Sequence, residues 1–166
     1  WRAGRDLDLG TLIAEVQSPP LRKLGVFELD QFFPPADRTK LAFTLNALVA
    51  GAEMLIPIQA EYYALEGLGQ LLETVEMVRQ HLNPDLVVST ILVTMYDART
   101  RLAAGVAEEV RDHFGDQVLK TTVPRSVRVS EAPSYGQTVM TYDPGSAGAL
   151  CYLEAAREIA SKGAPA

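Results

Sequence analysis

Residues 54–94 read MLIPIQAEYYALEGLGQLLETVEMVRQHLNPDLVVSTILVT and contain the pattern that decides the fold. This stretch opens with a short apolar run, 54–58, and closes with a β-branched run, 86–94. Such runs are typical of strands that are buried in a parallel sheet. Between them, residues 64–82 carry apolar side chains at three- and four-residue steps, which predicts a helix with one buried stripe. A strand, a helix and a strand in this order predict a right-handed crossover with parallel strands.

The alternation continues toward the carboxyl end of the chain. We expect a second helix over 100–114 that ends at Gly115, and a third strand over 118–123. Residues 139–142 are predicted to be extended. A turn follows them, and Ser146 is predicted to cap a last helix that runs to about Ser161. Strands that alternate with helices predict an α/β fold with helices flanking a parallel sheet.

The sequence divides into three parts. Residues 1–43 form a divergent amino-terminal segment, residues 44–161 carry the α/β pattern, and residues 162–166 are predicted to be a tail. In the first part, Leu7–Val16 could form a short helix and Leu24–Leu29 a strand. Three strands make a thin sheet, so either this segment adds strands or another chain covers the open edge.

Composition excludes several classes of protein. The 166 residues have a formal net charge of −6 and are 48% hydrophobic, which is typical of a globular domain. Cys151 is the only cysteine, so it can form neither an internal disulfide nor a zinc cluster, and we expect a cytoplasmic location. No run is long enough for a membrane span, so no membrane partner is expected. Any contact with nucleic acid requires a local basic patch, because the chain as a whole is acidic.

Ligands of open parallel sheets bind beyond the carboxyl ends of the strands, which makes residues 59–67, 95–101 and 124–136 candidate sites. The last two segments carry arginines. The stretch PRSVRVSEAPSYGQ, residues 124–137, is compatible with a phosphate-binding loop, a nucleotide pocket or a solvated connection. The residues alone do not choose among the three.

Three blocks of the sequence resemble a known family. They are IPIQAEYYALEGLGQ at 56–70, TILVTMYDARTRL at 90–102 and TVPRSVRVSEAPSYGQ at 122–137. In order and spacing they resemble the carboxyl half of the ParA/Soj chromosome-partitioning ATPases, from about Leu45 to Ala160. The resemblance implies the carboxyl half of a doubly wound, P-loop NTPase-like sheet. It also implies a protein that binds ATP with Mg²⁺, dimerises, and binds DNA without sequence preference near the nucleoid. A ParB-like centromere-binding protein is the partner that the family implies.

Two arginines take a DNA-binding role from this resemblance, Arg99 and Arg128. A guanidinium group is a permanently charged donor fork that suits phosphate oxygens. Without the resemblance, Arg99 would be interpreted as a residue at a helix start that pairs with Asp97, and Arg128 as a charge on a surface loop.

The resemblance also implies a nucleotide-binding segment. Met95, Pro124 and Arg125 match the strand ends that wrap the adenine base. Gln59 and Glu61 match a segment near the nucleotide and the dimer contact. For Met95, ordinary core packing is an equally good interpretation.

The sequence departs from the family in the parts that carry its catalysis. No Gly-Lys dipeptide occurs, and none of the four lysines follows a glycine-rich turn, so the phosphate-binding Walker A loop is absent from the sequence. No catalytic residue and no metal ligand is assigned. We expect a truncated, ATPase-deficient form. The alternatives are a non-catalytic remnant that binds DNA, pairs with itself or pairs with a full-length relative, and a marginally stable domain without function.

Overall fold

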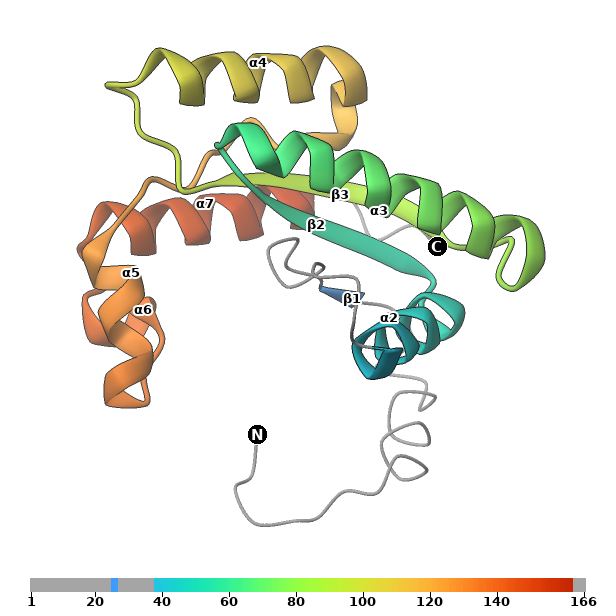
Figure 1. The fold of residues 1–166 in the computed structure, drawn as a ribbon. Helices are drawn as coiled ribbons and strands as arrows, with labels where there is room; N and C mark the ends of the chain where they lie inside the picture. The colour runs from blue at the N-terminus through green and yellow to red at the C-terminus, as the bar shows by residue number, and fades with distance from the viewer. Residues whose placement is uncertain (1–24, 27–37, 163–166) are drawn as a thin grey trace.

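The computed structural model describes residues 25–26 and 38–162. Three parallel strands form one sheet in the order β1-β2-β3, with β1 at Gly25–Val26, β2 at Glu53–Gln59 and β3 at Val87–Thr94. The helices are α2 (Arg38–Ala50), α3 (Tyr62–His81), α4 (Arg101–Phe114), α5 (Val127–Glu131), α6 (Val139–Tyr142) and α7 (Ala147–Lys162), with 3₁₀ turns η2 (Gly115–Gln117) and η3 (Ala132–Tyr135). The predicted α/β class with a parallel sheet is therefore confirmed (Figure 1).

Two amino-terminal predictions fall largely on undescribed residues. The helix expected at Leu7–Val16 lies outside the described residues. Of the strand expected at Leu24–Leu29, only Gly25 and Val26 are described, and they form β1. β1 pairs with Met54 and Leu55 of β2, so the amino-terminal segment does add a strand to the sheet.

The pairing of β2 with β3 forms the centre of the molecule. It runs in register from Glu53 opposite Val87 to Gln59 opposite Thr94, with one irregularity between Met54 and Leu55. Alternate residues of β2 are buried on one face, as a pleated strand requires: Met54, Ile56 and Ile58. This face is the floor of the main hydrophobic core.

Helices cover both faces of the sheet. α3 and α4 lie on one face and α7 lies on the other (Figure 1). The buried stripe of α3 is formed by Leu68, Leu71, Val75 and Val78, whereas Leu72, which was expected in it, is only partly buried. Leu82 was expected in this stripe, but it is exposed, because α3 ends at His81 and Leu82 is its C-terminal cap.

The predicted bounds of α4 are confirmed by its caps. The hydroxyl oxygen of Thr100 accepts a hydrogen bond from the amide of Ala103 at 3.3 Å, which satisfies one of the free donors at the helix start. Gly115 has φ of 52°, the left-handed region that glycine adopts without a steric penalty, and ends the helix. Ser146 likewise caps α7, as expected, through a 3.3 Å bond from the amide of Ala149.

The third strand predicted at 118–123 is wrong. The segment runs parallel to β3 but makes only isolated bridges, Ile91 to Val118 and Tyr96 to Pro124. The reason is the carboxylate of Glu158 on α7, which accepts hydrogen bonds from the amides of Lys120 at 2.7 Å and Thr121 at 3.0 Å. These donors are therefore not available to a β3 ladder, and the segment bulges.

Residues 139–142, predicted to be extended, form the short helix α6 instead. The carbonyl of Thr138 accepts hydrogen bonds from the amides of Thr141 at 3.1 Å and Tyr142 at 2.9 Å. Val139 is buried against Ala132 and Ala149. Packing of one helical face thus outweighs the β-propensity of these residues.

Gly148 provides a test of how α5 is held on α7. A Cβ at Gly148 would lie 2.6 Å from Cγ2 of Val129 and 3.3 Å from Oγ of Ser126. Because a β-branched valine is stiff at χ1, we expect Gly148→Ala to lower the free energy of unfolding by about 1–3 kcal/mol. Urea unfolding followed by circular dichroism measures this change.

The matched control is Gly105→Ala in α4, where an added Cβ meets nothing within 4 Å. Replacing an open helical glycine should raise the free energy of unfolding by roughly 0.5–1 kcal/mol. A stabilising Gly148→Ala would show that α5 does not pack against α7 as described.

Candidate functional site at the carboxyl ends of the strands

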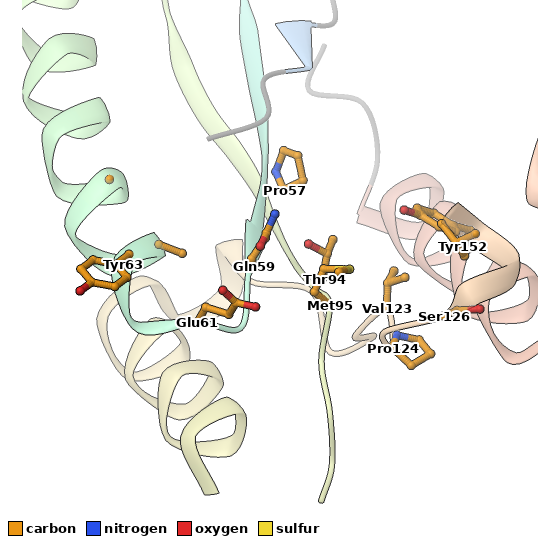
Figure 2. A pocket seen from close by; sticks show the side chains of 13 residues that line it. Pro57, Gln59, Glu61, Tyr63, Thr94, Met95, Val123, Pro124, Ser126 and Tyr152 are labelled. Carbon is orange, nitrogen blue, oxygen red and sulfur yellow. The ribbon is translucent and has the colours of Figure 1, made fainter. Parts of the chain in front are cut away.

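A cavity of about 420 Å³ lies where the strands end. Its walls come from the ends of β2 and β3, the start of α3, the 123–129 segment and α7 (Figure 2). The lining residues are Pro57, Gln59, Glu61, Tyr63, Ala64, Gly67, Thr94, Met95, Val123, Pro124, Ser126, Val129 and Tyr152. The cavity therefore stands at the edge where the sequence predicted a ligand site.

Four of the predicted site residues line this cavity: Gln59, Glu61, Met95 and Pro124. Gln59 is the last residue of β2 and Glu61 is the N-cap residue of α3, so the β2–α3 junction places both. Since they come from three separate segments, their convergence is a property of the fold and not of the local sequence.

Met95 has an unusual backbone conformation. Its φ is 52°, and Met95 is the only non-glycine residue with positive φ in the part of the chain that the structure describes. This left-handed conformation costs about 1–2 kcal/mol for an L-residue with a Cβ. It turns the chain directly after β3, and the Met95 side chain lines the cavity.

Pro124 is placed by hydrogen bonds to the chain that follows Met95. The amide of Tyr96 donates to the carbonyl of Val123 at 3.0 Å, and the amide of Arg125 donates to the carbonyl of Tyr96 at 3.0 Å. Pro124 lies between these two bonds, which fixes it beside the end of β3.

Arg125, the third residue predicted for the base pocket, is not among the residues that line the cavity. Its Nη2 donates to Oε1 of Glu61 at 2.8 Å, with both side chains about half exposed. The ion pair joins the 124–126 segment to the start of α3. Arg125 therefore reaches the cavity through Glu61, which does line it.

Arg99, predicted to bind DNA, stands at the entrance to α4. Its Nε and Nη2 donate to the two carboxylate oxygens of Asp97 at 2.9 and 2.8 Å, and its amide donates to Oδ1 at 3.0 Å. These bonds hold the pKa of Asp97 at about 2, below its ordinary value of 3.8. The pairing with Asp97 is the one that the residues alone predicted. The Arg99 side chain is 88% exposed, so it remains open to a ligand.

Arg128, the second predicted DNA contact, is in α5 and pairs with two carboxylates. Its Nη1 lies 3.2 Å from Oε2 of Glu131, and its Nε lies 3.4 Å from Oδ2 of Asp143. The expected loop is partly helical here, because α5 and η3 occupy most of 127–135. Both helices lie beyond the carboxyl ends of the strands (Figure 1).

Two polar residues of the cavity, Thr94 and Tyr152, lie outside the segments predicted to form the site, and Ser126 lies inside 124–136 but was not singled out. Thr94 ends β3, so the strand pattern contained a signal for it, and its hydroxyl donates to the carbonyl of Ile58 at 3.2 Å. Tyr152 comes from α7, and nothing in its local sequence indicates that it reaches the strand ends. Figure 2 shows Tyr152 on the same side as Val123 and Ser126, across from Glu61 and Tyr63.

Neither a metal centre nor a membrane span is found among the described residues. Across 25–26 and 38–162, no group of three or more His, Cys, Asp or Glu side chains could hold a metal ion. Within the same ranges, no helix is long and apolar enough to cross a bilayer.

Comparison with known proteins identifies the family. A family model described as an AAA domain matches residues 34–88. Soj of Bacillus subtilis, a sporulation initiation inhibitor protein, is 55% identical over 120 residues, which are 72% of this chain and 47% of Soj. The chromosome partitioning protein ParA of Caulobacter vibrioides is 50% identical over 119 residues, 72% of this chain and 45% of ParA. The chain belongs to the ParA/Soj family. It spans about half the length of these curated relatives.

Solved structures support the ParA/Soj assignment at the level of the fold. Cobyrinic acid a,c-diamide synthase of Mycobacterium smegmatis, solved with an ATP analogue and magnesium, is 34% identical with a TM-score of 0.50, over 67% of this chain and 38% of that one. The cell division ATPase MinD of Pyrococcus furiosus has a TM-score of 0.55 at 20% identity, over 70% of this chain and 46% of MinD. The predicted P-loop NTPase-like architecture is thus confirmed.

The Asp97–Arg99 pair gives a direct test of the site geometry. Because the folded-state pKa of Asp97 is lowered from 3.8 to about 2, the pair stabilises the fold fully above about pH 4. Its contribution is lost as the pH falls through 2. We expect carboxyl carbon NMR to report a pKa near 2 for Asp97 in the wild type. In Arg99→Ala the pKa should be clearly higher but still below 3.8, because the amide of residue 99 continues to donate to Oδ1 of Asp97.

Arg101→Ala is the matched control, because Arg101 is a neighbouring arginine that makes no contribution to the Asp97 pKa. An Asp97 pKa that stays low in Arg99→Ala, or that rises equally in Arg101→Ala, would contradict the pairing.

Proposed function

We propose that this chain acts in the partitioning of chromosomes or plasmids as a ParA/Soj-type protein. Its cavity receives the base of an adenine nucleotide, and Arg99 and Arg128 contact DNA without sequence preference. The observation that carries this proposal is the convergence of Gln59, Glu61, Met95 and Pro124 on one cavity. The resemblance assigns these residues to the nucleotide, and they come from three separate segments of the chain.

The walls of the cavity suit an uncharged planar ring. Pro57, Val123 and Pro124 present apolar surface, and Thr94 and Ser126 add hydroxyl groups that can hydrogen-bond a base edge or a ribose. Its volume of about 420 Å³ lies within the range of roughly 300–1,000 Å³ that is usual for small-molecule sites.

The same walls do not suit phosphates or Mg²⁺. Among the residues that the structure describes, no lysine or arginine lines the cavity, and the carboxylate of Glu61 is the one charged lining group. Glu61 is paired with Arg125, so the described lining offers a polyphosphate no net positive charge, and no carboxylate cluster that could hold a metal occurs in the described ranges. We therefore assign this part of the chain base recognition and no step of hydrolysis. Purified alone, the 166-residue chain is expected to turn over no ATP.

Calorimetry with adenosine and with ATP tests this assignment. Because no described cation faces the cavity, we expect the two dissociation constants to agree within about three-fold, which is less than roughly 0.7 kcal/mol. Met95→Ala removes one wall of the cavity and should weaken both ligands by about five- to thirty-fold, since the methionine surface that a ligand covers contributes roughly 1–2 kcal/mol.

Met77→Ala is the control for this experiment, because Met77 is half exposed on α3 and lies outside the cavity lining. ATP that binds a hundred-fold more tightly than adenosine would show that the chain has a phosphate site. Equal binding by Met95→Ala and wild type would place the base elsewhere.

The DNA contact is tested by the salt dependence of binding to a short duplex of arbitrary sequence. Each phosphate contact releases about 0.9 counterions, so Arg99→Ala and Arg128→Ala should each reduce the slope of log K against log salt by up to that amount. Arg157→Ala, an exposed arginine on α7, removes the same charge away from the strand ends and should leave the slope unchanged. Slopes equal to wild type in all three variants would contradict the DNA role.

A second candidate is a non-catalytic remnant that binds DNA or binds a partner, which would be a second copy, a full-length relative or a ParB-like protein. The observation in its favour is the exposure of two adjacent tyrosines at the start of α3, Tyr62 at 67% and Tyr63 at 81%. Exposed aromatic side chains are typical of protein interfaces. DNA binding by a chain that binds neither adenosine nor ATP would favour this candidate.

A further inference from the structure

Each of the three arginines predicted for the base pocket or the DNA contact is bonded to a carboxylate of the same chain. Arg99 makes a two-point bond with Asp97, Arg125 bonds to Glu61, and Arg128 contacts Glu131 and Asp143. All three arginines are therefore neutralised by neighbouring carboxylates, in a chain whose formal net charge is −6. A phosphate that approaches Arg99 or Arg128 therefore reaches a guanidinium group whose N–H donors already bond to carboxylate oxygens.

We propose that Asp97 and Asp143 are intramolecular competitors of the nucleic-acid backbone: they occupy the donors of Arg99 and Arg128, and DNA must displace them to bind. The inference rests on the DNA contact proposed above and describes how that contact is restrained. In this proposal, Asp97 and Asp143 regulate access to the arginines in addition to pairing with them.

The exposure of both arginines allows a phosphate to replace the carboxylate that each one bonds. The Arg99 side chain is 88% exposed and that of Arg128 is 55% exposed, so a phosphate can reach either one. Exposed ion pairs are weak, so we expect each carboxylate to lower the affinity for DNA only by roughly 1.4- to 5-fold. Competition of this size restrains binding without abolishing it.

Salt dependence gives the competition a distinctive signature. The counterion that a phosphate contact releases comes from the DNA, so this release is the same with an aspartate or an asparagine at position 97. The Arg99–Asp97 and Arg128–Asp143 pairs are at the surface, so salt screens them and their competition with DNA weakens as the salt concentration rises. The affinity gain of an Asp→Asn variant should therefore be largest at low salt, which makes its salt slope moderately steeper than that of the wild type.

The test measures duplex binding by the full 166-residue chain between low and moderate salt, with and without ATP and Mg²⁺. We expect Asp97→Asn and Asp143→Asn each to raise affinity about two- to five-fold and to steepen the slope. Asparagine at 97 keeps the oxygen that accepts the Arg99 amide, so the entrance to α4 is preserved. Glu131→Gln is a second variant of the Arg128 partners and should act in the same direction.

Asp85→Asn is the matched control, since Asp85 is exposed before β3, at the opposite end of the strand from Asp97. It changes net charge by the same amount and should leave the slope unchanged. If Asp85→Asn steepens the slope equally, or if wild type binds DNA and Asp97→Asn and Asp143→Asn match it, the proposal is wrong. If wild type and every variant fail to bind DNA, the proposed DNA contact itself fails.

Discussion

The candidate site depends on the hydrogen bonds that β3 makes along its two edges. On one edge, β2 pairs with β3 up to the bond from the amide of Ala60 to the carbonyl of Thr94, at 2.9 Å. On the other edge, the amide of Val123 donates to the carbonyl of Val93 at 2.9 Å. Because both neighbours are parallel to β3, all three segments end at the same edge of the sheet. The β2–α3 junction, the turn at Met95 and Pro124 meet there for this reason.

The segment before Pro124 shows how a long-range contact adjusts that register. Leu119 donates to Ile91 and Val123 donates to Val93, so four residues of the segment span two residues of β3. The extra length bulges toward α7, where Glu158 accepts hydrogen bonds from both Lys120 and Thr121. Partial burial alone would raise the pKa of Glu158, but these bonds together lower it. The charged carboxylate of Glu158 thus accepts the backbone hydrogen bonds that a neighbouring strand would otherwise accept. By holding this segment, it helps to position Pro124 at the cavity.

This contact also explains which features the sequence could predict. The elements β2, α3, β3 and α4 follow from periodicities and caps within one or two turns of chain, and Thr100 and Gly115 mark the two ends of α4 locally. By contrast, Glu158 acts on residues that are 37 and 38 positions away, and Tyr152 enters the cavity from α7. No local pattern records such contacts. The resemblance to the ParA/Soj family named Met95 and Pro124, which residue chemistry alone would have assigned equally well to the core or to a turn.

Met95 gives an independent reason to regard the cavity as functional. A glycine adopts φ of 52° without the steric penalty that a Cβ imposes, so glycine is the less costly residue for the turn after β3. The strain is held in place by the bonds that Tyr96 makes to Val123 and Arg125 on the residues that follow. A glycine at this position would lack the Met95 side chain that lines the cavity. Backbone strain that a smaller residue would relieve is common where the side chain itself contacts a ligand. The conformation of Met95 therefore favours a ligand in this cavity over ordinary core packing, the alternative that its sequence context left open.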